Sequence, residues 1–374
     1  MKKRVGLIVN PVAGMGGRVA LKGSDGRETL LRAIELGATP LSSQRTVAAL
    51  KRLVPIKESI ELITYPYDMG EEEARECGIA PVILGSVTKG ETTSLDTRRA
   101  AKEMAAMKID LLLFAGGDGT ARDIYDALGD RLAVLGIPAG VKIHSAVFAI
   151  TPLRAGDLAR MYLQGSISLI REAEVMDIDE VLLRERDRVS ARLYGYLKIP
   201  WDSGFTQGPK QASAGGEREE AAGQAIAERV IETMERDWIY IIGPGTTTRP
   251  IMEKLGLKNT LLGVDVIRNR QVLLNDAKAA DLLLLFNGKK AKIVVTPIGG
   301  QGYILGRGNQ QISPEVVRRV GTENIVVIAT PGKIFSLRLN PLLVDTGDED
   351  LDRSLRGYRR VITGFGEEMV CKVA

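Results

Sequence analysis

The chain has 374 residues, more than a single hydrophobic core usually serves, so two domains are expected. Hydrophobic residues make up 44% and charged residues 26%, as in an ordinary globular protein, and the 5% of aromatic residues are too few for a platform that stacks bases. The 51 basic and 47 acidic residues are spread along the chain and give a net charge of +4. This mild excess suits small phosphate-bearing molecules and argues against nucleic acid as a partner.

Cysteine, histidine and long apolar runs are too scarce for several classes of protein. Cys77 and Cys371 lie far apart and His144 is the single histidine, which excludes a disulfide framework and a multi-histidine metal centre. The apolar run at residues 5–9 is too short for a signal peptide, and no run approaches the roughly 20 residues that span a bilayer. We therefore expect a cytoplasmic protein without a membrane partner.

Short apolar runs alternate with helical patterns along the first 150 residues. Strands are predicted at residues 5–9, 59–64, 81–84, 110–115 and 133–136, and the clearest helices at residues 42–53 and 94–107. Such alternation predicts βαβ units, so residues 1–150 are expected to form an α/β domain with a parallel sheet.

The remaining residues, 151–374, predict a second domain of mixed α/β structure that is rich in strands. Strands are predicted at residues 189–198, 238–242, 292–296 and 324–329, with closing strands at 361–363 and 369–373. Either domain could receive the closing strands. The Gly-, Glu-, Gln- and Ala-rich residues 207–223 predict a loop.

The strongest motif is Gly116-Gly117-Asp118-Gly119-Thr120, between a predicted strand and a predicted helix. Glycines allow an anion to approach the backbone closely, and the free N–H groups of a helix start attract it, so this turn predicts a phosphate site. A carboxylate beside phosphates is electrostatically unfavourable unless it binds a metal or transfers a proton. Asp118 is therefore a candidate general base or magnesium-positioning group. An ordinary Asp-Gly turn is the alternative, although that step usually joins two strands.

Two further glycine-rich loops could hold phosphates. The first is at residues 243–248, after a predicted strand, and its threonines fit either ligand binding or a helix N-cap. The second is at residues 299–311, which fits a loop that wraps a ligand and equally an ordinary surface loop.

The loop at residues 10–17 is not a dinucleotide fingerprint, because Val19 stands where the third glycine is required. No Walker A motif is present either. His144 fits a structural role better than a catalytic one, and Lys142 could reach a phosphate or point to solvent. Asp177, Asp179 and Glu180 could bind ribose hydroxyls or magnesium, or simply precede a strand.

These segments together resemble the NAD kinase superfamily, in which a G-G-D-G-T turn is shared with diacylglycerol and sphingosine kinases. The closer resemblance is to the ATP-NAD kinase group that includes AcoX-type proteins. It is carried by residues 10–17, 114–123, 136–148, 243–248, 261–265 and 296–311.

The resemblance implies a Rossmann-like N-terminal domain, an active site in the interdomain cleft, and transfer of a phosphoryl group to the 2′-hydroxyl of the NAD adenosine ribose. It implies ATP or polyphosphate as donor, a divalent cation such as Mg²⁺ whose ligands stay open, and a possible homo-oligomer. Asp118 is the implied catalytic residue. The implied nucleotide-binding residues are Asn10, Gly116, Gly117, Gly119, Thr120, Gly243, Gly245, Thr246, Thr247 and Thr248. The implied substrate-binding residues are Asp123, Lys142, His144, Ser145, Asp179, Glu180, Gly300, Gln301 and Arg307.

The acceptor stays open, because residues 136–145, 179–180 and 243–248 depart from the family's usual acceptor motifs. A related kinase acting on a lipid, sugar or polyol hydroxyl is one alternative, although no basic amphipathic helix is evident for membrane contact. A regulatory protein that binds a nucleotide without catalysis is the other.

Overall fold

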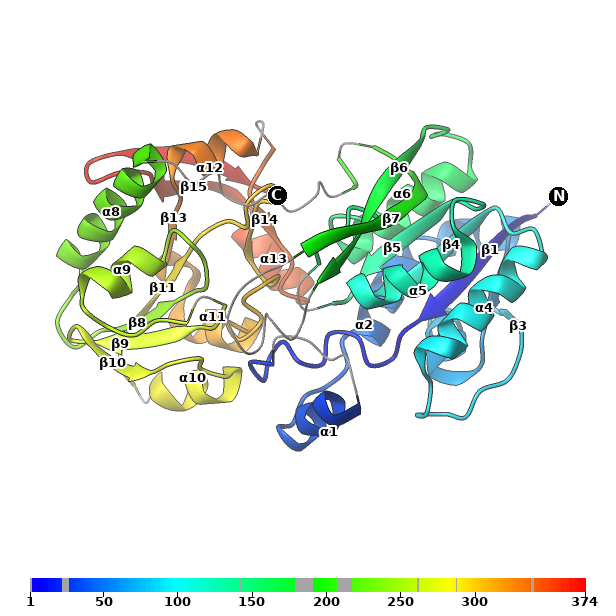
Figure 1. Cartoon of the computed structure of the whole chain (residues 1–374), viewed down its shortest axis with the longest axis horizontal. Helices are drawn as coiled ribbons and strands as arrows, with labels where there is room; N and C mark the ends of the chain where they lie inside the picture. Colours follow the sequence, from blue (N-terminus) through cyan, green and yellow to red (C-terminus); the bar gives the residue numbers. More distant parts are fainter. Residues whose placement is uncertain are drawn as a thin grey trace. The chain divides into compact units, whose positions relative to one another are not determined.

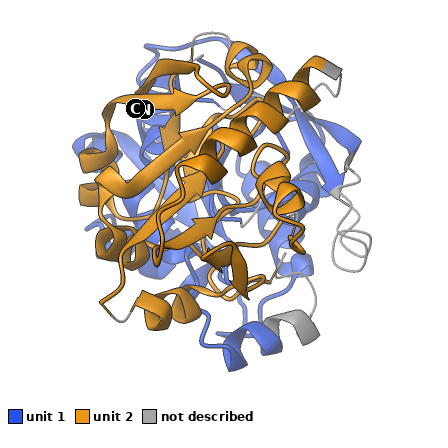
Figure 2. Cartoon of the chain, turned by 90° about the vertical axis from the view of Figure 1, so that its left-hand side faces the viewer, with its two compact units in different colours: residues 1–15, 23–209 blue, residues 16–22, 210–374 orange. Residues whose placement is uncertain are grey.

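The computed structural model describes residues 2–21, 27–140, 143–178, 191–202, 204–206, 217–260, 262–286, 288–337 and 340–374. The chain divides into two compact units: residues 1–15 and 23–209 form the first unit, and residues 16–22 and 210–374 form the second (Figure 2). The sequence pattern predicts a boundary after residue 150. Residues 151–209 instead belong to the first unit, because α6 (Pro152–Leu163) and the antiparallel pair of β6 (Ile170–Ile178) and β7 (Ala191–Pro200) pack into its cores.

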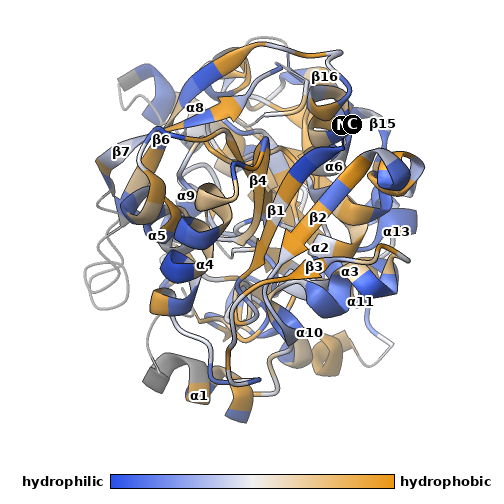
Figure 3. Ribbon diagram, turned by 90° about the vertical axis from the view of Figure 1, so that its right-hand side faces the viewer, coloured by the Kyte–Doolittle hydropathy of each residue, from blue (hydrophilic) through white to orange (hydrophobic). Residues whose placement is uncertain are grey.

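A parallel five-stranded sheet forms the centre of the first unit. Its strands are β1 (Lys3–Val9), β2 (Ile60–Thr64), β3 (Val82–Ile83), β4 (Leu111–Gly116) and β5 (Val134–Pro138), in the order β3-β2-β1-β4-β5. The strand β1 begins with hydrophilic residues and is hydrophobic further along, where its residues are buried (Figure 3). The predicted parallel sheet is therefore confirmed.

Helices cover both faces of this sheet. Alternate residues of each central strand point to opposite faces, so Leu113 packs in one core and Phe114 in the other. α2 (Ser42–Lys51) and α6 pack with Leu113, whereas α4 (Ser94–Ala106) and α5 (Asp118–Leu128) pack with Phe114. The antiparallel pair of β6 (Ile170–Ile178) and β7 (Ala191–Pro200) adds to the second of these cores. The shorter helical elements are α1 (Arg27–Glu35), η1 (Val54–Ser59), η2 (Tyr67–Met69) and α3 (Glu71–Glu76).

The second unit is built on a mixed sheet of seven strands. Their order is β10-β9-β8-β11-β13-β15-β16, with β8, β11, β13 and β15 parallel and the outer strands antiparallel. The strands are β8 (Ile239–Ile242), β9 (Asp265–Arg268), β10 (Gln271–Leu274), β11 (Ala291–Val295), β13 (Ile325–Ile328), β15 (Gly357–Ile362) and β16 (Glu368–Val373). The closing strands thus complete the sheet of the second unit (Figure 1).

Helices also lie on both faces of the second sheet. α8 (Glu217–Glu232) and α9 (Arg249–Lys254) pack on one face, and α10 (Ala279–Phe286), α11 (Pro314–Val320) and α13 (Glu349–Leu355) on the other. The remaining elements are β12 (Tyr303–Leu305), η3 (Thr322–Asn324), α12 (Pro331–Ser336) and β14 (Leu343–Val344).

Helix α8 corrects part of the loop that was predicted at residues 207–223. Residues 207–216 lie outside the described part of the chain, but from Glu217 onward the chain is helical. Its alanines and glutamates favour a helix, and Ile226 and Val230 are buried on one side of it. Among the described residues, no helix has the length and apolar character needed to cross a membrane.

Candidate active site

The predicted phosphate-binding residues of the first unit lie where the strand order of its sheet reverses. Strands β2 and β3 lie on one side of β1, and β4 and β5 on the other. Asn10 follows β1, and the loop at residues 116–120 follows β4. In open α/β sheets, ligands bind at such a reversal, outside the carboxyl ends of the strands. The glycine motif therefore occupies the place where this fold offers a ligand site.

The loop after β4 is in direct backbone contact with the loop after β5. The N–H groups of Ala139 and Gly140 both donate to the Gly116 carbonyl at 2.9 Å. A Cβ added to Gly140 would lie 2.8 Å from the Gly117 Cα, closer than real Cβ atoms come to backbone. A glycine is therefore needed for the two loops to approach this closely.

Asp118 is the first residue of α5, and the loop after β5 holds its carboxylate. Its Oδ2 accepts the backbone N–H of His144, and its Oδ1 that of Ser145, each at 2.9 Å. Asp118 is only 8% exposed, whereas Gly117 and Gly119 on either side are half-buried. The predicted strand, turn and helix are confirmed here, and the turn presents accessible backbone beside a buried carboxylate.

The environment of Asp118 shifts its protonation equilibrium. Burial raises the pKa of the Asp118 carboxyl above its usual value of 3.8, because the charged form loses its hydration. Hydrogen bonds from Ser145 and the His144 backbone, together with the charge of Arg122, oppose this rise. The carboxyl thus resembles a tuned acid–base group, with a pKa displaced by burial and partly restored by specific donors.

Asn10 connects the loop after β1 to the start of α5. Its Nδ2 donates to the Thr120 hydroxyl at 3.0 Å, and its Oδ1 accepts the Val12 N–H at 3.2 Å. Its own N–H donates to the Ala115 carbonyl at 3.0 Å. Asn10 and Thr120 therefore lie together at the switch point.

Charged residues on α5 form ion pairs with neighbouring elements. Asp123, an implied substrate-binding residue, accepts from the Arg98 guanidinium of α4 at 2.8 Å. Arg122 and Arg192 both pair with the carboxylate of Asp177 on β6. This three-residue cluster could not be predicted from the sequence, because nothing in the spacing of its members shows that β6 lies beside α5.

The loop at residues 243–248 also follows a parallel strand, β8, in the second unit. Gly245 has a φ of +141°, and a Cβ there would lie 2.6 Å from the Thr296 Cγ2, so glycine lets the loop pack on Thr296. Thr247 and Thr248 are buried, whereas Thr246 is exposed. The Thr248 hydroxyl donates to the Gly245 carbonyl at 2.9 Å.

The glycine tract at residues 299–311 is mostly folded into the second unit. The Arg307 guanidinium donates to the Asp345 carboxylate at 3.2 Å, and the two side chains are 3% and 5% exposed. Arg307 also stacks on Tyr303, with its Cζ 4.5 Å from the ring centroid. Gln301 is buried and Gly300 is half-buried, in the turn that precedes β12.

Three implied substrate-binding residues, Lys142, Asp179 and Glu180, lie outside the described residues. Within the described part, no group of three His, Cys, Asp or Glu side chains is arranged to hold a metal ion. Mg²⁺ usually binds through one or two carboxylates together with substrate phosphates and water, so a site completed by a nucleotide fits this arrangement. Asp118 is the buried carboxylate nearest the loop that would receive the phosphates.

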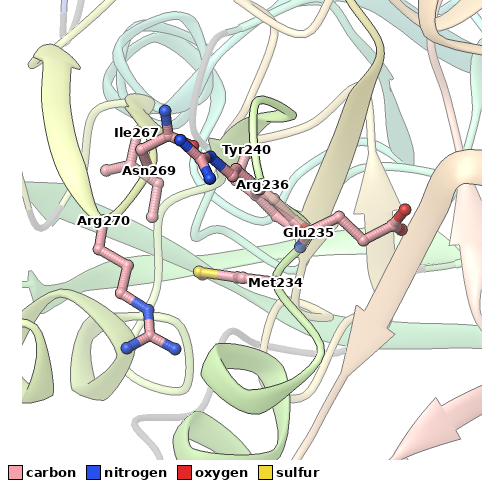
Figure 4. Close-up of a pocket in the computed structure, with 7 residues that line it drawn as sticks. All are labelled: Met234, Glu235, Arg236, Tyr240, Ile267, Asn269 and Arg270. Carbon is pink, nitrogen blue, oxygen red and sulfur yellow. The ribbon is translucent and has the colours of Figure 1, made fainter.

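A pocket of about 410 Å³ lies elsewhere in the second unit. Its lining residues come from the end of the α8 region, from β8 and from the β9–β10 turn, and they are Met234, Glu235, Arg236, Tyr240, Ile267, Asn269 and Arg270 (Figure 4). None of them belongs to the predicted site. The pocket lies at the amino end of β8, opposite the edge at which residues 243–248 begin.

The first unit is thus a Rossmann-like α/β unit with a glycine loop and a buried carboxylate at its switch point. Two family models match the chain in order: the ATP-NAD kinase N-terminal domain over residues 5–167 and the ATP-NAD kinase C-terminal domain over residues 236–373. The two matches together cover most of the chain. The protein belongs to the ATP-NAD kinase family.

Comparison with individual proteins adds little to the family match. A solved structure described as a diacylglycerol kinase from Bacillus anthracis str. Sterne is 17% identical, with a TM-score of 0.25, over 47% of this chain and 46% of that chain. The chain therefore spans about half of that protein, and at this TM-score the likeness supports no inference about fold or function. No curated protein matches the chain.

Proposed function

We propose that this protein is a cytoplasmic NAD kinase, which transfers the terminal phosphoryl group of ATP or polyphosphate to the 2′-hydroxyl of the NAD adenosine ribose and releases NADP. The observation that carries this proposal is the position of Asp118. It is a buried carboxylate at the start of α5, at the switch point of the sheet, between glycines whose backbone is accessible. Membership of the ATP-NAD kinase family supports the same reaction.

The residues at the switch point would divide the work between positioning and proton transfer. The backbone of residues 116–120 and the start of α5 would hold the phosphates, and Asn10 would fix Thr120 at the rim of this loop. Asp118 would accept the proton of the ribose 2′-hydroxyl. As the hydroxyl oxygen bonds to the terminal phosphorus, the bond between that phosphorus and the leaving phosphate would break. A divalent cation, when bound with the nucleotide, would neutralise phosphate charge.

The test is direct detection of the product. The full chain is incubated with Mg²⁺, with ATP or polyphosphate, and with NAD, NADH, diacylglycerol or polyols in parallel, and the products are identified by mass. We expect the mass of NADP from NAD, and the Lys258→Met variant, altered at an exposed lysine, should give the same yield. A phosphorylated lipid or polyol instead would assign another acceptor, and ligand-induced stabilisation without any product would indicate a sensor.

The pH dependence of turnover should report the carboxyl of Asp118. Burial raises its pKa, so the proton-accepting form appears only as the pH rises through a value above 3.8. We expect kcat to increase with pH along an acid limb at saturating substrate, and to level off once Asp118 is ionised. The same raised pKa implies that the stability this group contributes is present below pH 3.8 and is lost as the pH rises through its folded pKa. A flat profile from acid to neutral pH would contradict the role of Asp118 as base.

A further inference from the structure

A buried lysine lies beside threonine hydroxyls at one edge of the second sheet. Lys333, on α12, is 6% exposed. Its Nζ donates to the Thr247 hydroxyl at 2.9 Å and to the Thr296 hydroxyl at 3.3 Å. Both threonines are also buried.

The fold brings these three residues together at the carboxyl ends of neighbouring strands. Thr247 follows β8, Thr296 follows β11, and Lys333 follows β13, and these three strands are parallel and adjacent. This is the edge at which open α/β sheets bind ligands. The Thr330 hydroxyl accepts the Lys333 N–H at 3.4 Å and thereby fixes the start of α12.

The hydrogen-bonding pattern leaves donors for a ligand. Each threonine oxygen accepts from Lys333, so its own proton is free to be donated in another direction. Within the described part of the chain, neither the Thr247 nor the Thr296 hydroxyl donates to a protein acceptor. Two buried O–H groups are therefore positioned to donate to a negatively charged oxygen, and the positive charge of Lys333 lies beside them.

The surroundings of the cluster provide access from solvent. Thr246 and Gly332, each next to a member of the cluster in sequence, are exposed, and Gly245 is half-buried. An anion would therefore approach the hydroxyls from the side of these exposed residues.

We propose that Lys333, Thr247 and Thr296 form a phosphate-binding site in the second unit, which holds either inorganic phosphate or the phosphate group of a nucleotide. The lysine supplies the charge, and the hydroxyls supply directed hydrogen bonds to the phosphate oxygens. The site is defined by contacts within the second unit alone, so it does not depend on the kinase activity proposed above.

The test is calorimetric titration of the full chain with inorganic phosphate and, separately, with ATP. Lys333→Met should lower the phosphate affinity of one class of binding site by about 10- to 100-fold, which is the loss expected when a charged hydrogen-bonding group is removed. Thr247→Val and Thr296→Val keep the side-chain shape and should each weaken the same class by about 3- to 10-fold. Binding of ATP without binding of free phosphate would identify the nucleotide as the source of the group.

Two controls keep this proposal separate from folding defects and from the kinase proposal. Lys258→Met removes an exposed lysine of the second unit and should leave phosphate affinity unchanged. Asp118→Asn should also retain this site, even if it forms no product. Urea unfolding verifies that each variant is folded. Native affinity in folded Lys333→Met, or in both threonine variants, would overturn the proposal.

Discussion

Replacement of Asp118 by asparagine is expected to lower kcat at least about a hundredfold, because it removes the group that we propose as the proton acceptor. The substitution is not structurally neutral. Both carboxylate oxygens accept backbone N–H groups, from His144 and Ser145, whereas an amide offers one oxygen and turns its NH₂ group toward one of these donors. We therefore also expect a loss of about 1–3 kcal/mol in the free energy of unfolding.

A matched variant separates the two effects of Asp118→Asn. Thr64→Val removes a buried hydroxyl that donates to the Leu7 carbonyl at 2.9 Å and to the Met69 carbonyl at 3.2 Å, in the same unit. It should cost a similar free energy of unfolding but leave kcat nearly native below the unfolding transition. Turnover is measured by NADP formation and stability by urea denaturation. Equal kcat values for the two variants would show that Asp118 acts only through structure.

The strands of the first sheet and most strands of the second could be predicted from the sequence, because apolar runs with glycine or proline at their ends are local signals. The short strands β9 and β10 of the second sheet were not predicted. The same signals located the turn at residues 116–120 between β4 and α5. The partners of Asp118 could not be predicted, since they depend on the loop after β5 folding against the loop after β4. Local composition also predicts a loop at residues 217–223. This prediction is wrong, because burial of one face of α8 stabilises a helix there.

Residues 16–22 show a second limit of local signals. They follow β1 of the first unit but pack in the second, where the Arg18 carbonyl accepts the Ala279 N–H at 3.1 Å and Gly17 lies against Gln310. Such contacts between distant parts of the sequence leave no periodic pattern. Lys333 could have been found, because Thr330-Pro331-Gly332 follows a predicted strand in the same way as the loops at residues 116–120 and 243–248.

The second large effect is expected from Arg307, which the resemblance implies to bind substrate and which the structure pairs with Asp345. Both side chains are almost fully buried, so Arg307→Met leaves a buried carboxylate without this partner. We expect a loss of about 3–5 kcal/mol in the free energy of unfolding of the second unit. The double variant Arg307→Met/Asp345→Leu removes both charges and should recover most of this loss, because apolar replacements of a buried ion pair are often close to neutral.

Urea unfolding measures this cycle most directly through tryptophan fluorescence in a Trp201→Phe background, where Trp238 of the second unit remains as the reporter. The recovery in the double variant is the decisive result, since an arginine that acts on substrate would not regain function or stability when Asp345 is removed. Arg307→Met could instead lower the free energy of unfolding by less than about 1 kcal/mol and raise KM for the acceptor. The ion pair of Arg307 with Asp345 would then not be what holds the glycine tract at residues 299–311 in place. Arg307 would then be a substrate-binding residue, as the resemblance implies.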